Sequence, residues 1–133
     1  MTIDENIEYW LNSANENLID AEGLLNIGRY LFAGYACQLA IEKMLKAIIA
    51  SYDKIPPKIH NLTRLSEIAK IDSLLEEKQI TLLDIISGLQ IEARYPNYKE
   101  KLSQQLNKEK CEEYLAFAKE FYQWVTNKLL KQY

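Results

Sequence analysis

The chain has 133 residues, of which 48% are hydrophobic and 26% charged, a composition typical of a soluble globular domain. It contains only four glycines and three prolines, too few turn-forming residues for a many-stranded barrel or sandwich. Nineteen acidic against sixteen basic side chains give a net charge of −3, so charge alone does not indicate a nucleic-acid- or membrane-binding protein. We therefore expect a single all-α domain, residues 1–133, built from a few long helices.

The first predicted helix begins at a capping box, in which Thr2 and Glu5 satisfy each other's backbone N–H groups. Apolar residues then recur every three or four positions up to Leu25, and Gly28 is placed to end the helix. Residues 1–28 carry six acidic side chains and no lysine or arginine. This imbalance predicts an acidic helix face, which in most proteins is simply a solvated surface.

The second predicted helix, from Tyr30 to about Tyr52, is apolar on nearly all sides, so we place it at the centre of a helical bundle. A short polar stripe interrupts it. Polar side chains on so apolar a helix need partners, because an unpaired buried charge is strongly destabilising. A structural ion-pair stripe is the simplest interpretation, and a functional site is the alternative. The stripe consists of Gln38, Glu42 and Lys46 at intervals of four residues, with Lys43 beside them.

Pro56 and Pro57 exclude further helix and mark a loop that carries His60, the only histidine of the chain. A short third helix follows between about residues 62 and 71, and Asn61 is positioned to cap its N-terminus. A lone loop histidine is more often a hydrogen-bonded structural residue than a catalytic one.

Two further amphipathic helices complete the chain. The fourth is predicted from about Leu74 to Arg94, with Gly88 expected to loosen it. It should end there because Pro96 disfavours helical geometry in the residue before it. The last helix is predicted over about 108–130. Four long helices and one short one predict an up-and-down four-helix bundle with a short extra helix.

Several classes of site are excluded by composition. One histidine and two separated cysteines, Cys37 and Cys111, are too few ligands for a structural zinc, di-iron or haem site, so we expect no metal and no cofactor. The chain has no Walker A loop, no dinucleotide-binding glycine motif and no nucleophile elbow. Its first residues do not resemble a signal peptide, and no window is apolar enough for a membrane span. We expect a cytoplasmic protein with reduced thiols.

Residues 35–47 read YACQLAIEKMLKA, residues 60–62 read HNL, and residues 93–96 read ARYP. In this order, the three segments resemble the small stand-alone HEPN (higher eukaryotes and prokaryotes nucleotide-binding) proteins, and the likeness extends over nearly the whole chain. The resemblance implies a five-helix fold around an up-and-down bundle, usually a homodimer. It also implies pairing with a separate minimal nucleotidyltransferase, in toxin–antitoxin-like or nucleotide-handling modules.

Many HEPN proteins are metal-independent ribonucleases that use an Arg-x(4–6)-His motif. Arg94 matches the arginine, but residues 99–101, where the histidine would follow, are Lys, Glu and Lys. Acid–base catalysis near neutral pH needs a group that titrates there, so we favour a non-catalytic protein over an enzyme. Such a protein would bind a nucleotide or single-stranded RNA through Arg94 and Lys99, with Tyr95 or Tyr98 stacking on a base.

Two alternatives stay open. A metal-independent endoribonuclease with a degenerate motif would use Arg94 to stabilise the charged phosphorane, and Lys99 or His60 to transfer the proton. A helical protein-interaction module without a ligand would instead dock a basic partner on the acidic first helix, where Glu16 and Asp20 lie.

Overall fold

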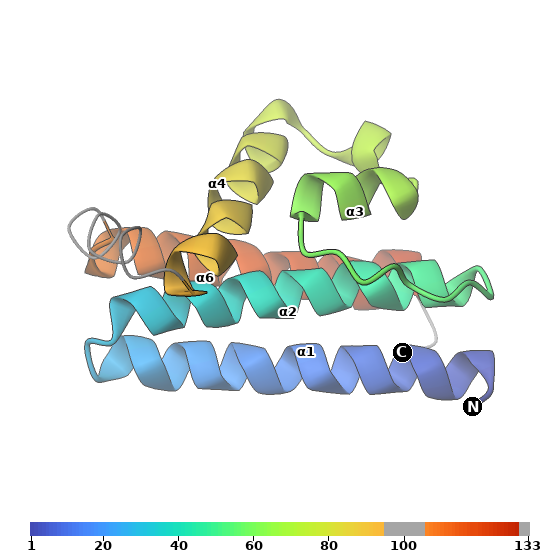
Figure 1. The fold of residues 1–133 in the computed structure, drawn as a ribbon, viewed down its shortest axis with the longest axis horizontal. Helices are drawn as coiled ribbons and strands as arrows, with labels where there is room; N and C mark the ends of the chain where they lie inside the picture. The colour runs from blue at the N-terminus through green and yellow to red at the C-terminus, as the bar shows by residue number, and fades with distance from the viewer. Residues whose placement is uncertain (95–105, 131–133) are drawn as a thin grey trace.

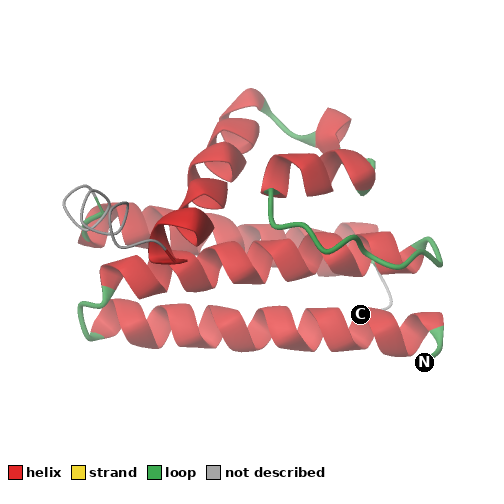
Figure 2. Ribbon diagram, viewed as in Figure 1, coloured by secondary structure: helices red, strands yellow, loops and turns green. Residues whose placement is uncertain are grey.

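Figure 1 shows the computed structural model of the chain, which describes residues 1–94 and 106–130, the last four residues of the first range by their backbone alone. The described residues hold five α-helices, and no strand occurs among them (Figure 2), so the prediction of an all-α fold is confirmed. Three long helices lie side by side, with the first antiparallel to the second and the last, and the remaining long helix crosses the second at a steep angle (Figure 1). Within these ranges, no helix is long and apolar enough to cross a membrane.

The first two helices form an antiparallel hairpin. α1 (Ile3–Asn26) begins at the predicted capping box: Thr2 Oγ1 accepts a hydrogen bond from the Glu5 N–H, and Glu5 Oε1 accepts one from the Thr2 N–H, both at 3.1 Å. The chain turns at Gly28, whose φ of 78° lies in the left-handed region that glycine adopts without strain. α2 (Tyr30–Ser51) then runs back along α1.

A short α3 (Leu62–Ile68) and the longer α4 (Glu77–Arg94) follow the proline loop. As predicted, Asn61 caps α3, because its side chain accepts a backbone N–H from the first turn at 2.9 Å. α3 ends earlier and α4 begins later than predicted, since a 3₁₀ turn, η1 (Asp72–Leu74), separates them. The expected loosening at Gly88 is absent, and α4 continues through this residue.

The last helix, α6 (Lys108–Trp124), begins at the predicted residue, and the Asn107 side chain caps it by accepting a backbone N–H at 2.9 Å. Its final turn changes winding: η2 (Val125–Leu129) is π-helical. There the Leu130 N–H donates to the Val125 carbonyl oxygen, five residues back, at 2.8 Å. The prediction of a helix over 108–130 is therefore right in extent, while the α-helical winding stops at Trp124.

α2 lies at the centre of the fold. It packs against α1, α3, α4 and α6, and none of its residues is exposed, which confirms the prediction of a surrounded central helix. α6 runs in the same direction as α2, since Cys111 Sγ near the start of α6 contacts the carbonyl oxygen of Tyr30 at the start of α2, at 3.2 Å. α4 is inclined across α2 and packs against α2 and α3 (Figure 1).

α4 packs closely against α2 at Gly34. A Cβ atom at this position would lie 2.9 Å from Leu89 Cδ1 of α4 and 3.2 Å from Leu106 Cδ2. Both distances are shorter than an ordinary carbon–carbon contact, so a side chain at residue 34 would force the ends of Leu89 and Leu106 to move. The absence of a side chain at Gly34 therefore leaves room for these two leucines against α2.

Replacing Gly34 with leucine should lower the free energy of unfolding by about 1–3 kcal/mol, because the added side chain overpacks the contact between α2 and α4. The control is Gly88→Ala in α4, where a Cβ atom meets nothing within 4 Å. That change should stabilise the helix by about 0.5–1 kcal/mol. Urea unfolding followed by circular dichroism measures both, and a Gly34→Leu variant as stable as the wild type would contradict the close approach.

Cys37 on α2 and Cys111 on α6 are both buried. Burial raises the pKa of Cys37 to about 12 and that of Cys111 to about 11, so both thiols stay protonated at neutral pH. We predict that Ellman's reagent reacts far more slowly with the native protein than with the protein in guanidinium chloride at the same mildly alkaline pH. Rapid reaction of either native thiol would show that α6 does not stay packed on α2.

Candidate functional site

Three polar residues on one face of α2 meet the loop that precedes α3. Gln38, Glu42 and Lys46 follow one another at intervals of one helical turn. Gln38 Nε2 donates to Glu42 Oε1 at 3.0 Å and to the carbonyl oxygen of His60 at 3.2 Å. The three α2 side chains are buried, whereas the side chain of His60 is 41% exposed. We call these four residues the Glu42 cluster.

The carboxylate of Glu42 accepts three hydrogen bonds. Its Oε1 accepts from Gln38 Nε2 and from His60 Nδ1, each at 3.0 Å, and its Oε2 accepts from Lys46 Nζ at 3.1 Å. A buried carboxylate without partners is strongly destabilising, and here three donors and one opposite charge offset its desolvation. Lys46 Nζ also lies 5.7 Å from the centroid of the Trp10 ring, a cation–π contact with α1. The cluster therefore connects α1, α2 and the loop between α2 and α3 that carries His60. We call this segment the histidine loop.

The contact with Glu42 selects one tautomer of the neutral His60 ring. An ionised carboxylate only accepts hydrogen bonds, so Nδ1 must carry a proton to donate to it. In the neutral imidazole, Nε2 then keeps its lone pair. Because Nδ1 is already engaged and the side chain is partly exposed, the ring can meet a bound molecule through Nε2.

Hydrogen bonds between α3 and α4 hold the histidine loop from the other side. The backbone N–H of Leu62 donates to Ser87 Oγ at 3.0 Å. In addition, Thr63 Oγ1 donates to Asp84 Oδ1. His60 therefore lies where α2, α3 and α4 come together, and its position is set by all three helices.

One buried polar atom of the cluster has no partner. Gln38 Oε1 finds no hydrogen-bond donor in the part of the chain that the structure describes, although the residue has no exposed surface. An unsatisfied buried acceptor is destabilising, and native structures contain few of them. The Glu42 cluster thus keeps one unused acceptor close to His60.

Five other predicted site residues are not part of the Glu42 cluster as described. Lys43 follows Glu42 directly but lies on a neighbouring face of α2, where it is half-buried and makes no ion pair with any described residue. Arg94 is the last residue of α4, and only its backbone is described. Outside the described residues lie Tyr95, Tyr98 and Lys99.

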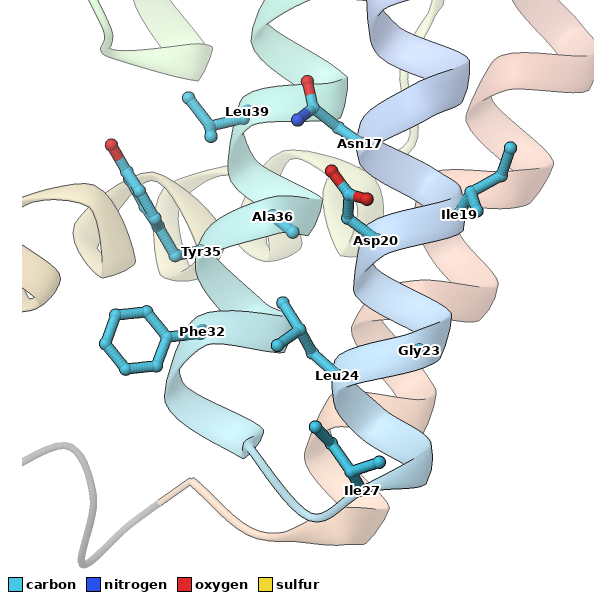
Figure 3. Close-up of a pocket in the computed structure, with 10 residues that line it drawn as sticks. All are labelled: Asn17, Ile19, Asp20, Gly23, Leu24, Ile27, Phe32, Tyr35, Ala36 and Leu39. Atoms are coloured by element: carbon cyan, nitrogen blue, oxygen red, sulfur yellow. The ribbon is translucent and has the colours of Figure 1, made fainter.

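The structure also contains a groove between α1 and α2 that the sequence did not predict. It has a volume of about 490 Å³ and is lined mainly by apolar side chains (Figure 3). Ile19, Leu24 and Ile27 contribute to it from α1 and from the residue that follows this helix. Ile19 and Ile27 fall outside the apolar stripe that α1 turns toward the core, whereas Leu24 packs partly against the core. The two displaced isoleucines are the sequence signal that indicates the groove.

Replacing Glu42 with glutamine should lower the free energy of unfolding by about 3 kcal/mol, because the buried ammonium of Lys46 loses its counter-charge. The control is Glu67→Gln, which removes an exposed ion pair with Arg64 and should cost less than about 1 kcal/mol. Adding Lys46→Met to Glu42→Gln should recover part of the loss, since the unpaired charge is then gone. Urea unfolding measures the free energy of unfolding of all these variants. Equal decreases for Glu42→Gln and Glu67→Gln would contradict a buried ion pair between Glu42 and Lys46.

Comparison with known proteins places the chain in a family. Residues 7–129 match the family model described as the HEPN domain. No curated protein matches the chain. Among solved structures, the crystal structure of TT1696 from Thermus thermophilus is similar, with a TM-score of 0.77 and 24% sequence identity over 90% of this chain and 94% of that chain. This likeness shows the fold alone.

The family match covers the helices that build the Glu42 cluster, together with α6. At the level of the family, it supports a function related to nucleotides or RNA. We conclude that the chain belongs to the HEPN domain family.

Proposed function

We propose that this protein binds a nucleotide or single-stranded RNA, without cleaving it, on the side of α2 that carries the Glu42 cluster. The observation that carries the proposal is the fixed ring of His60, whose Nδ1 is held by a buried carboxylate while the side chain is 41% exposed. A ring already held in one orientation can hydrogen-bond a base edge or a ribose hydroxyl with little further loss of entropy. Membership in the HEPN family supports the class of ligand.

Arg94 is the residue that we propose for the phosphate. It ends α4 about two turns after Ser87, which accepts the N–H of Leu62 beside His60. The rise of an α-helix separates the two positions by about 10 Å along α4. This separation is comparable with the length of one nucleotide, so one molecule can place its base near His60 and its phosphate near Arg94.

A guanidinium group suits this role because its planar fork can donate two hydrogen bonds to one phosphate. We propose that Lys99 adds a second positive charge and that Tyr95 or Tyr98 stacks on a base. These residues follow Arg94 closely in the chain, so they share its end of α4 by covalent connection.

The proposal extends to partners. It includes a homodimer and a separate minimal nucleotidyltransferase, in a toxin–antitoxin-like or nucleotide-handling module. In such a pair this chain would hold the nucleotide or RNA, while the partner would supply Mg²⁺ and catalyse the transfer. The support is the resemblance of residues 35–47, 60–62 and 93–96 to proteins that work in such pairs.

Arg94→Ala should weaken binding of a fluorescein-labelled single-stranded RNA and of ATP by about tenfold or more, because a charge-assisted phosphate contact is lost. Arg94→Lys should have an affinity between those of the wild type and Arg94→Ala, since lysine keeps the positive charge but lacks the planar guanidinium fork. The control is Lys119→Ala, which removes a positive charge on α6, where Lys119 pairs with Glu22 of α1. Fluorescence anisotropy and calorimetry in EDTA measure these affinities; absence of binding by the wild type, or equal effects of the two alanine variants, would refute the proposal.

A second candidate function, a metal-independent endoribonuclease, is favoured by one observation. A histidine oriented by a buried carboxylate is an arrangement that serves acid–base catalysis. Here His60 Nε2 would take the proton of a ribose 2′-hydroxyl as that oxygen attacks the adjacent phosphorus. The bond to the 5′-oxygen would break, and that oxygen would take a proton from water. Arg94 would stabilise the charged phosphorane.

This activity predicts cleavage of single-stranded RNA that persists in EDTA and disappears in both His60→Ala and Arg94→Ala. Lys119→Ala serves again as the control and should cleave like the wild type. Cleavage that survives in His60→Ala, or intact RNA after prolonged incubation with the wild type, would exclude the His60 mechanism. RNA that binds but stays intact supports the non-catalytic function.

A further inference from the structure

The groove between α1 and α2 is an apolar surface that the described residues leave uncovered. Phe32, Tyr35 and Leu39 line it from α2, and the side chains of Leu24 and Ala36 lie between the two helices (Figure 3). At its edge Ile19 is 62% exposed and Ile27 is 72% exposed. Large apolar side chains gathered beside an open groove typically mark a surface that another molecule covers.

We propose that this groove docks an amphipathic helix of a partner protein, with its apolar row in the groove and its lysines and arginines along α1. The proposal does not depend on the proposed nucleotide or RNA site. The groove runs between two helices that lie side by side, so it fits a single row of apolar side chains. An amphipathic helix presents its apolar side chains in such a row.

The charges around the groove indicate which charge the partner helix should carry. Among the residues that the structure describes, Asp20 is the only charged one that lines the groove. Glu16 lies one turn earlier on the same face of α1, and this helix carries no basic residue. On the α2 side, Arg29 precedes the helix and holds its guanidinium carbon 5.4 Å from the centre of the Phe32 ring, while Lys43 lies one turn beyond Leu39. The negative charge therefore lies along the α1 side, and the partner's positive charges should face that side.

An amide oxygen beside the groove also lacks a partner. Asn17 lines the groove, and its Oδ1 is buried and has no hydrogen-bond donor within reach in the described ranges. Because this oxygen has no exposed surface, a docked lysine or arginine can donate to it only after the amide group rotates toward the groove. A second copy of this chain set α1 against α1 would instead oppose Glu16 and Asp20 with the same two carboxylates. The structure therefore favours a basic partner over that arrangement.

The test uses a designed helical peptide of about 18 residues, with leucine in one apolar row and lysine elsewhere, and a matched peptide with glutamate in place of lysine. The full-length protein should bind the lysine peptide at least about tenfold more tightly than the glutamate peptide. Asp20→Lys should weaken binding of the lysine peptide by about tenfold, and Ile27→Ser should weaken it by about threefold or more. Fluorescence anisotropy measures all of these affinities.

The matched control is Glu8→Lys, which makes the same charge change on α1 at an exposed residue outside the groove. This variant should bind the lysine peptide within about twofold of the wild type. Equal weakening by Asp20→Lys and Glu8→Lys would show attraction to net charge alone and would overturn the proposal. Equal binding of the two peptides would overturn it as well.

Analytical ultracentrifugation tests the other possible occupant of the groove, a second copy of this chain. A dimer that Ile27→Ser or Asp20→Lys converts to a monomer would show that a second copy covers the groove, which contradicts a basic partner helix there. Thermal unfolding confirms that each variant is folded. Arg94→Ala should keep peptide binding and Asp20→Lys should keep RNA binding, so the failure of one proposal is distinguishable from the failure of the other.

Discussion

The carboxylate of Glu42 is the constraint on which the site depends. It is buried in the central helix, where an ionised group is tolerated only with donors around it. Two of these donors come from α2 itself, and the third comes from His60 at the end of a proline-containing loop. Satisfying this one group therefore fixes both the loop and the orientation of the only histidine ring in the chain.

The packing around α2 extends this constraint to the rest of the fold. Gly34 leaves room for a leucine of α4 against the N-terminal half of α2, while Ser87 of α4 bonds to the backbone beside His60. The end of α4 and the histidine loop thus lie along one side of the same buried helix. α1 takes part through Trp10, which contacts the ammonium of Lys46. The same α1–α2 hairpin also carries an apolar groove with an acidic edge.

Local interactions made much of the fold predictable. The capping box of Thr2, the turn at Gly28 and the cap at Asn61 involve residues close in sequence, so their pattern is visible without coordinates. The partner of Glu42 was not predictable, because His60 lies far along the chain and no periodicity relates the two residues. The groove was obscured for a different reason: apolar spacing identifies a helix and its apolar faces, but not which of them a neighbouring helix covers.

The most direct test of the account is the tautomer of His60. With ¹⁵N-labelled histidine, a long-range ¹H–¹⁵N spectrum should show a single ring, since the chain has one histidine. The account predicts that the neutral ring carries its proton on Nδ1 and leaves Nε2 unprotonated, and that Glu42→Ala, which removes the acceptor of Nδ1–H, abolishes this preference. A neutral ring protonated on Nε2, or one that averages between both forms in the wild type, would contradict a histidine held by Glu42.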